Sequence, residues 1–301
     1  MQSELSSSLS QGPAERLSPG LYIVATPIGN LADLSPRAAD WLRRADLIAA
    51  EDSRQTAKLL AHIGSSVPMT PYHDHNADAV RPRLLQKAAT AAVALVSDAG
   101  TPLISDPGFK LVREAYAQGV AVTTAPGPCA AIAALSLAGL PTDRFLFMGF
   151  LPTKAGARAQ AVQEVRDVRA TLIFYEAARR ADEVLALLAE ILGPRPAAVV
   201  REITKTYEEV LRDDLPGLAA RLAAQPVKGE VVIVVGPPTG DSAPDGAALD
   251  EALRAALADM PLKTAVAHVV ATLHVPRKVA YARALALRDV DNAHDVAPPT
   301  R

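Results

Sequence analysis

The sequence holds a single cysteine, Cys129, among its 301 residues. An internal disulfide is therefore excluded, and so is a cysteine-rich zinc or iron–sulfur site. This cysteine usage fits a protein of the reducing cytoplasm. No uninterrupted apolar run reaches the roughly 18 residues of a membrane-spanning helix, so we expect no membrane partner.

The motifs of several large enzyme classes are also missing. No G-x-G-x-x-G string follows the first expected strand, and no G-x-x-x-x-G-K-[ST], H-E-x-x-H or G-x-S-x-G string occurs. The usual dinucleotide fingerprint, the P-loop, the zinc-protease helix and the serine-hydrolase elbow are thus excluded. His73, Asp74 and His75 are either metal ligands or part of a solvated loop, and the loop is the favoured interpretation.

Net charge is small as well. The chain has 31 Lys and Arg against 33 Asp and Glu, a net charge of −2, and a pI near 6.3. Proteins that clamp long RNA by neutralising phosphates are usually basic, so the balance argues mildly against nucleic acid. Two local basic clusters remain, which either contact RNA or form solvated helix faces: Lys154, Arg158, Arg166 and Arg169, and Lys263, Arg277, Lys278, Arg283 and Arg288.

Half of the residues are apolar, which predicts a large core, and 301 residues suffice for two domains. Residues 1–19 are rich in serine and lack an apolar segment, so we expect a disordered leader and no signal peptide. Strands alternating with helices over residues 20–140 predict an α/β domain with a mostly parallel sheet. Strands are expected at residues 21–25, 47–50, 93–96 and 120–124.

Beyond residue 140 a second α/β domain is expected over residues 141–238, with a sheet that can be mixed. Its strands are expected at residues 145–150, 171–175, 198–201, 207–211 and 231–235. A turn-rich linker at residues 239–246 then leads to three helices over residues 247–290. Their spacing, with a restart at Val275-Pro276, is typical of a helix-turn-helix appendage.

The centre of the first domain is the loop Ser97-Asp98-Ala99-Gly100-Thr101-Pro102-Leu103-Ile104-Ser105-Asp106-Pro107-Gly108, which follows a short apolar strand. In an open α/β sheet, ligands bind at the loops after the carboxyl ends of strands. Small residues there let a ligand approach bare backbone. An ordinary strand-to-helix turn is the alternative interpretation.

Together with three other loops, this stretch resembles the tetrapyrrole-methylase superfamily. The other loops are Thr26-Pro27-Ile28-Gly29-Asn30-Leu31, Glu51-Asp52-Ser53-Arg54 and Pro126-Gly127-Pro128. The resemblance is strongest to the small-subunit rRNA methyltransferase I branch. It continues through Gly149-Phe150-Leu151-Pro152, Phe174-Tyr175-Glu176, the segment from Arg201 to Lys205, and Lys228-Gly229-Glu230. Ala177-Ala178-Arg179 replaces the usual Ser-Pro-His, so no role of that histidine carries over.

The resemblance implies two α/β domains with a cofactor cleft between them. It also implies S-adenosylmethionine as cofactor, no metal, and a cytoplasmic homodimer that acts on 16S rRNA in the small ribosomal subunit. The expected reaction is methylation of a cytidine ribose 2′-hydroxyl in the decoding region. We expect Pro27, Gly29, Asp98, Gly100, Thr101 and Pro128 to bind the cofactor, Glu51, Asp52 and Arg54 to act in catalysis, and Glu176, Lys205, Arg277 and Lys278 to bind the substrate.

Two other functions stay open at this point. One is methylation of a tetrapyrrole ring carbon, and the other is non-catalytic RNA binding on the same fold. The Glu-Asp-Ser-Arg loop and the terminal helices favour the RNA methyltransferase over the first. Calorimetric cofactor binding would separate it from the second.

Overall fold

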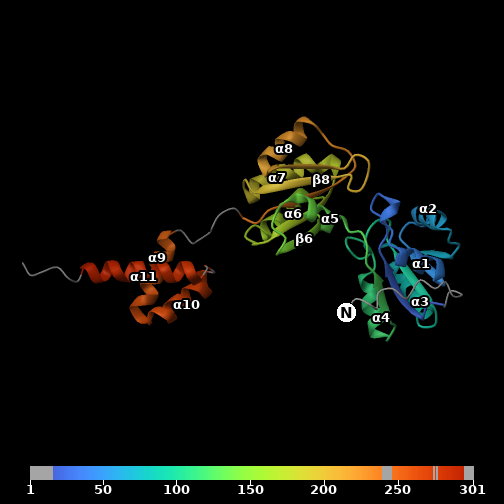
Figure 1. Cartoon of the computed structure of the whole chain (residues 1–301), viewed down its shortest axis with the longest axis horizontal. Coiled ribbons are helices and arrows are strands. Elements are labelled where there is room, and N and C mark those ends of the chain that lie inside the picture. Colours follow the sequence, from blue (N-terminus) through green and yellow to red (C-terminus); the bar gives the residue numbers. More distant parts are fainter. Residues whose placement is uncertain (1–15, 239–245, 274, 276, 295–301) are drawn as a thin grey trace, which may run out of the picture. The chain divides into compact units, whose positions relative to one another are not determined.

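The computed structural model describes residues 16–238, 246–273, 275 and 277–294 (Figure 1). Two compact units adjoin in the sequence at Pro237 and Pro238. Residues 1–15 of the expected leader and residues 239–245 of the expected linker lie outside the described residues.

The first unit begins with a sheet of five parallel strands in the order β3-β2-β4-β1-β5. Every residue of β1 and β4 is buried, as is typical of parallel strands that are covered on both faces. Sequence analysis did not predict β3, which has only three residues. The strands are β1 (Gly20–Val24), β2 (Leu47–Ala50), β3 (Met69–Pro71), β4 (Ala92–Val96) and β5 (Val122–Ala125).

Helices cover both faces of this sheet. α1 (Pro36–Arg44) and α2 (Ser53–Ile63) pack on one face, and α3 (Ala77–Ala88) and α4 (Phe109–Ala117) on the other. A short 3₁₀ turn, η1 (Leu31–Asp33), precedes α1. As predicted, Ser35 caps α1 by accepting a hydrogen bond from Ala38 N at 3.1 Å, and Pro36 occupies the first turn.

The next helix, α5 (Ala130–Ala138), follows β5 in sequence but packs against the second sheet. Its residues Ala134 and Leu135 join Ile173, Val200 and Val232 of that sheet in one core cluster. The domain boundary expected at residue 140 therefore separates α5 from the sheet on which it packs. The small side chains of α5 allow this close approach.

The second sheet is mixed, in the order β6-β7-β10-β8-β9. β6 runs parallel to β7, and the other neighbours are antiparallel. Its strands are β6 (Phe145–Phe150), β7 (Thr171–Ala177), β8 (Pro196–Arg201), β9 (Glu209–Asp214) and β10 (Glu230–Val235). The last strand of the unit, β10, thus lies in the middle of the sheet. The two-sheet α/β architecture predicted from the sequence is confirmed.

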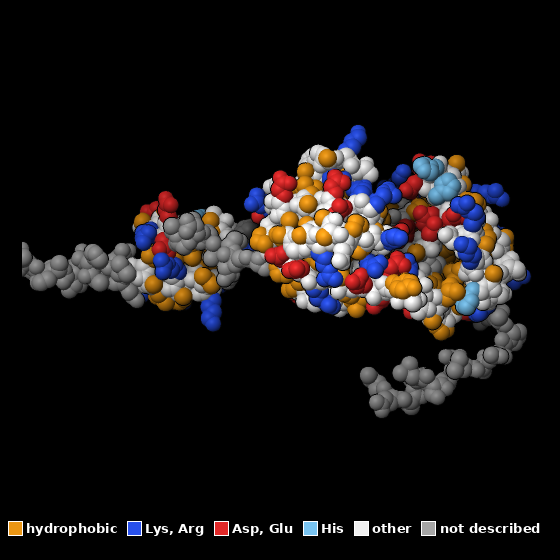
Figure 2. Space-filling view, turned by 90° about the horizontal axis from the view of Figure 1, so that it is seen from above, with side chains coloured by type: hydrophobic (Ala, Val, Ile, Leu, Met, Phe, Trp, Pro, Cys, Tyr) orange, Lys and Arg blue, Asp and Glu red, His pale blue; other side chains and the backbone are white. Residues whose placement is uncertain are grey.

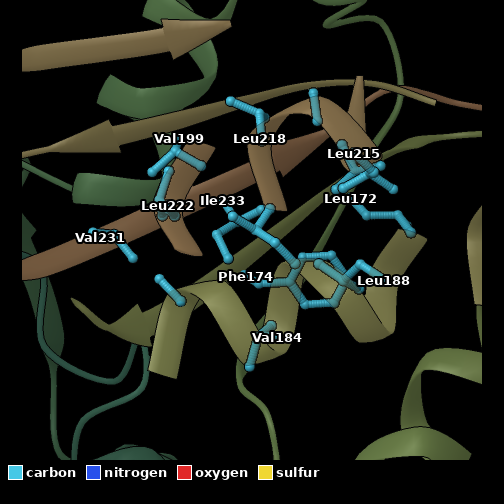
Figure 3. Packing of buried hydrophobic residues seen from close by; sticks show 14 of the residues in the cluster. Leu172, Phe174, Val184, Leu188, Val199, Leu215, Leu218, Leu222, Val231 and Ile233 are labelled. Atoms are coloured by element: carbon cyan, nitrogen blue, oxygen red, sulfur yellow. The ribbon is translucent and has the colours of Figure 1, made fainter. Parts of the chain in front are cut away.

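The face opposite α5 is covered by α6 (Ala155–Glu164), α7 (Ala181–Leu192) and α8 (Leu215–Ala224), with the 3₁₀ turn η2 (Ala178–Arg180) before α7. Phe174 of β7 and Ile233 of β10 are paired in register and fully buried. Figure 3 shows them against Val184 and Leu188 of α7. Both faces of the second sheet are therefore covered, by α5 on one side and by α6, α7 and α8 on the other.

The second unit consists of α9 (Gly246–Asp259), α10 (Leu262–Leu273) and α11 (Arg277–His294). The three helices share a core of their own, which includes Leu253, Val266, Val269, Ala280 and Ala284. The helix-turn-helix arrangement expected from the sequence is therefore present. Among the described residues, no helix is both long and apolar enough to cross a membrane.

Candidate active site

A cavity of about 250 Å³ lies within the first unit, lined by loops at the carboxyl edge of the first sheet and by residues of the second sheet. This position is the usual ligand site of an open α/β sheet. The pocket is lined by Ile28, Glu51, Asp98, Ala99, Gly100, Thr101, Ile104, Ser105, Asp106, Cys129, Ala130, Phe150, Tyr175, Glu176, Val200, Glu202, Ile203, Lys205, Glu230, Val231 and Val232.

Hydrogen bonds at Gly100 and Thr101 connect the central loop to the loops after β1 and β5. Gly100 and Thr26 exchange two backbone hydrogen bonds of 2.8 and 3.1 Å. Gly100 has a φ of +84°, and a Cβ there would lie 3.2 Å from Ile28 Cγ2. Thr101 Oγ1 donates to Pro128 O at 2.9 Å. The structure thus brings three of the four predicted loops together, and Gly100 and Thr101 line the pocket.

Three residues expected to bind the cofactor, Pro27, Gly29 and Pro128, are not among the lining residues. Pro27 and Pro128 are half-buried and belong to the loops that Gly100 and Thr101 hold. Gly29 lies in close contact with the loop after β8. A Cβ on Gly29 would lie 2.7 Å from Lys205 Cγ and 2.9 Å from Thr204 Oγ1, so the glycine lets the loop after β1 pack against the loop after β8.

The pocket wall formed by the first sheet is acidic. Asp98 N donates to Glu51 Oε2 at 3.2 Å, and Asp98 Oδ1 accepts from Asp52 N at 2.9 Å, so the loops after β2 and β4 hold each other. Burial raises the pKa of Glu51, and the charges of Asp98 and Asp74 add to the effect. Figure 2 shows acidic side chains gathered where the surface of the first unit is hollowed, next to histidines.

Asp106 is a pocket residue that sequence reasoning missed. Burial raises its pKa from 3.8 to about 6, the charges of Glu51 and Asp98 push in the same direction, and the Ser97 hydroxyl opposes them. A carboxylate with such a pKa in a pocket is typical of a functional site. The signal available in the sequence was its place in the central loop.

Asp52 and Arg54, which we expected to act in catalysis, do not line the pocket. Asp52 caps α2, where its Oδ1 accepts from Arg54 N at 2.8 Å, and it also accepts from the Arg54 guanidinium at 2.7 Å. These hydrogen bonds lower the pKa of Asp52 to about 2. The Arg54 side chain is 90% exposed. Asp52 and Arg54 thus form an ion pair at the start of α2.

Glu176 and Lys205, expected to bind the substrate, both line the pocket on its second side. Glu176 is only 2% exposed, and its Oε2 lies 3.1 Å from Arg180 Nη2. The arginine that follows the altered Ala177-Ala178-Arg179 segment thus holds the carboxylate. Lys205 Nζ donates to Glu202 Oε1 at 3.1 Å.

Backbone strain concentrates in two of the loops around the pocket. Among the described residues, four non-glycine residues have a positive φ: Leu103, Ser105, Glu202 and Thr204. Two belong to the central loop and two to the loop after β8. Each such conformation costs on the order of 1–3 kcal/mol and persists where the surroundings enforce it, often at ligand sites.

Two aromatic side chains complete the lining. Tyr175 stacks edge-on against Phe147 and Phe150, with ring centroids 4.9 and 5.5 Å apart. Its hydroxyl accepts a hydrogen bond from Ala131 N at 2.9 Å, and burial raises its pKa. Both Phe150 and Tyr175 belong to motifs quoted above, but the sequence alone indicates no role for them.

The remaining candidates are charged residues outside the pocket. Arg158 is buried and pairs with Glu183, so it belongs to the fold of the second sheet. In the second unit, Arg277 and Lys278 are exposed at the start of α11. Arg283 instead forms two hydrogen bonds of 2.6 and 2.7 Å with Asp250. Among the described residues, no group of three or more His, Cys, Asp or Glu side chains is placed to hold a metal.

Comparison with known proteins agrees with this architecture. The family model Tetrapyrrole (Corrin/Porphyrin) Methylases matches residues 20–219, and the model RsmI C-terminal HTH domain matches residues 243–288. Ribosomal RNA small subunit methyltransferase I of Mesorhizobium japonicum is 44% identical over 286 residues, which is 94% of this chain and 97% of that protein. The protein of the same name from Erythrobacter litoralis is 50% identical over 275 residues, which is 91% of this chain and 98% of that protein.

The chain belongs to the ribosomal RNA small subunit methyltransferase I family. The fold of this family is shared more widely. Diphthine synthase superposes with a TM-score of 0.58 at 17% identity, covering 72% of this chain and 89% of that one. Uroporphyrin-III C-methyltransferase of Thermus thermophilus, solved with S-adenyl homocysteine, superposes with a TM-score of 0.51 at 20% identity. The match covers 72% of this chain and 97% of that one. The expectation of a tetrapyrrole-methylase fold is confirmed, and family membership favours the RNA branch over tetrapyrrole methylation.

Proposed function

We propose that this protein transfers the methyl group of S-adenosylmethionine to the 2′-hydroxyl of a cytidine ribose in the decoding region of 16S rRNA. The observation that carries the proposal is family membership over nearly the whole chain, since relatives named rRNA small subunit methyltransferase I align along 94% and 91% of it. The pocket supports the proposal independently through its chemistry.

The pocket fits a cationic cofactor. Its lining contains six carboxylates and one lysine, together with apolar side chains such as Ile28, Val200 and Val232. S-adenosylmethionine supplies a methyl group on a positively charged sulfonium, which a wall of carboxylates stabilises. Asp98 and Asp106 would face the positive groups, and the backbone around Gly100 would lie against the ligand.

Methyl transfer to a hydroxyl depends mainly on positioning. Aligning donor and acceptor can contribute on the order of 7–11 kcal/mol to lowering the barrier. Here the alignment would come from loops that are already fixed by the Thr26–Gly100 bridge and the Thr101–Pro128 hydrogen bond. Removal of the hydroxyl proton requires an acceptor at the rim of the same pocket.

The small ribosomal subunit is the proposed partner, and the reaction would take place in the cytoplasm. Arg277 and Lys278 of α11 would contact RNA phosphates, while Arg54 lies exposed at the rim of the site. Positive charge at the start of a helix opposes the helix dipole, so these two residues do not serve helix stability. RNA contact explains their position.

A homodimer is the proposed assembly. Phe109 and Tyr116 on α4 are each 65% exposed, which is unfavourable for large apolar side chains in a lone subunit. Light scattering of the purified protein tests this part. A monomer at micromolar concentration would contradict it.

The test of the function is a map of ribose methylation in 16S rRNA from cells that lack the protein. One cytidine in the decoding region should lose its 2′-O-methyl group and regain it on expression of the wild-type chain. Gly100→Val is the matched control, because it should fold without binding the cofactor and should not restore the methyl group. An unchanged methylation pattern in the deletion strain would refute the substrate assignment.

A further inference from the structure

We propose that His73 is the proton acceptor for the ribose 2′-hydroxyl and that Glu51 orients its imidazole. The inference rests on the proposed function, and it assigns a catalytic residue in the segment that sequence analysis interpreted as a solvated loop. This segment, residues 72–76, follows β3 at the carboxyl edge of the first sheet.

Strand register places His73 next to the pocket. β2 and β3 are parallel neighbours with Ala50 opposite Pro71, and Tyr72 N donates to Ala50 O at 2.7 Å. Glu51 and His73 therefore leave adjacent strand ends at the same edge. Glu51 lines the pocket, and the charges of His73 and Asp74 both affect the pKa of its carboxyl.

The backbone of the 72–76 loop is held without the imidazole. Asn76 Oδ1 accepts from His73 N at 2.9 Å, and Asn76 Nδ2 donates to Pro71 O at 3.0 Å. His73 O accepts from Asn76 N and Ala77 N at 3.0 and 2.9 Å. A replacement of the His73 side chain leaves all four hydrogen bonds intact, so a merely structural role predicts little effect.

The imidazole itself is half-buried, and its Nδ1 atom is buried without a hydrogen-bond partner among the described residues. Buried polar atoms in native proteins usually form hydrogen bonds, so we expect Nδ1 of His73 to have a hydrogen-bond partner. Glu51 is close enough for His73 to affect the pKa of its carboxyl, and this carboxylate is fixed by the hydrogen bond from Asp98 N. With Nδ1–H donated to Glu51, Nε2 presents a lone pair to the substrate.

The proton and charge balance of the step is complete. The bond between the ribose 2′-oxygen and the methyl carbon forms while the carbon–sulfur bond breaks, and the hydroxyl proton passes to His73 Nε2. Positive charge lost at the sulfonium reappears on the imidazolium, beside Glu51. The imidazolium then returns its proton to solvent.

Asp52, which follows Glu51 in the sequence, is less suited to this role. Asp52 is bound to Arg54, and its pKa of about 2 makes it a weak base. Titratable groups near His73 include Glu51 from the end of β2 and Asp74 and His75 from its own loop. The ring of His75 lies 6.0 Å away, and its side chain is exposed.

His75 provides a matched control. The full-length variants His73→Asn and His75→Asn would be compared in single-turnover methylation of small subunits from the deletion strain, with S-adenosylmethionine binding followed by calorimetry. His73→Asn should lower the methylation rate about 10²- to 10⁴-fold, with cofactor affinity unchanged. His75→Asn should keep the wild-type rate. Equal rates for the two variants would overturn the proposal.

A second measurement is independent of activity. Nitrogen-15 NMR of labelled histidines in the wild-type protein should show His73 as the Nδ1–H tautomer, and Glu51→Gln should abolish this preference. An Nε2–H tautomer in the wild type would overturn the assignment of the base even if the enzyme is active. If the wild type does not methylate small subunits at all, the proposed function fails and the catalytic role of His73 fails with it.

Discussion

Asp106 is a carboxylate whose ionisation opposes folding, and its replacement by asparagine should stabilise the first unit. Moving a carboxyl pKa from 3.8 to about 6 corresponds to a cost of about 3 kcal/mol at neutral pH, at about 1.4 kcal/mol per pKa unit. Because Asp106 is only half-buried, solvent screening reduces this to about 1–2 kcal/mol. The amide introduced by Asp106→Asn carries no charge, so the free-energy cost of burying an ionised carboxylate is absent.

The sign of the effect follows from linkage between protonation and folding. Below pH 3.8 the carboxyl is protonated in both the folded and the unfolded chain, so Asp106 imposes no cost. As the pH rises to about 6, the unfolded chain ionises first, and the folded state loses stability. The gain from Asp106→Asn should therefore be complete above about pH 6.5 and fall to about a third at pH 4.5.

Tryptophan fluorescence is the suitable assay. Trp41 is the only tryptophan of the chain and lies in α1, so its signal follows the first unit alone. At pH 7.5 the midpoint of thermal unfolding should rise by about 2–8 °C in Asp106→Asn. Asp143→Asn, which alters an exposed carboxyl, is the control and should leave the midpoint unchanged. A midpoint that stays or falls at pH 7.5, or a gain that is equal at pH 4.5, would refute the reasoning.

Three further predictions concern the pocket loop and the helical unit. Gly100→Val should abolish S-adenosylmethionine binding in calorimetry while the circular dichroism spectrum stays native, because φ is +84° and a Cβ would lie 3.2 Å from Ile28; micromolar affinity would contradict it. Asp250→Ala should shift unfolding of the three-helix unit, followed by loss of helical signal, to lower urea, since Arg283 loses both hydrogen bonds; an unchanged transition would show that the pair is dispensable. The double variant of Arg277 and Lys278 to Ala should reduce the salt slope of small-subunit binding by about 1.4–1.8, with cofactor binding unchanged; an unaltered slope would exclude phosphate contact.

The features that could be predicted from the sequence are those encoded locally. The strands β1 and β4 are short apolar runs, and the loops that follow them contain glycine, proline and aspartate in an order that identifies the family. Because the carboxyl ends of parallel strands share one edge, the order of the loops was enough to predict that they converge. Gly100 and Thr101 occupy the pocket for that reason.

What could not be predicted depends on where a side chain points or on a distant partner. Asp52 has the right chemistry for catalysis, but its place as the cap of α2 turns its carboxylate to Arg54. Arg158 and Arg283 looked like RNA contacts, yet each pairs with an acid 25 or 33 residues away in the sequence. Glu230 reaches the pocket only because β10 inserts between β7 and β8, an arrangement that no local pattern encodes.

The strand order of the second sheet has a consequence for biosynthesis. All strands of the first sheet have been made once Ala125 has left the ribosome, whereas β10 ends at Val235 and fills the middle of its sheet. From Arg201, where β8 ends, to Val235 the chain takes about 2–7 s to synthesise at about 5–20 residues per second, and during this time β7 and β8 each lack a neighbour. Glu230, Val231 and Val232 arrive with β10 and close one wall of the pocket. A nascent chain that stalls or is cut before this strand therefore combines a finished first sheet with exposed edges on β7 and β8, which are targets for chaperones and proteases, and it lacks this wall of the pocket.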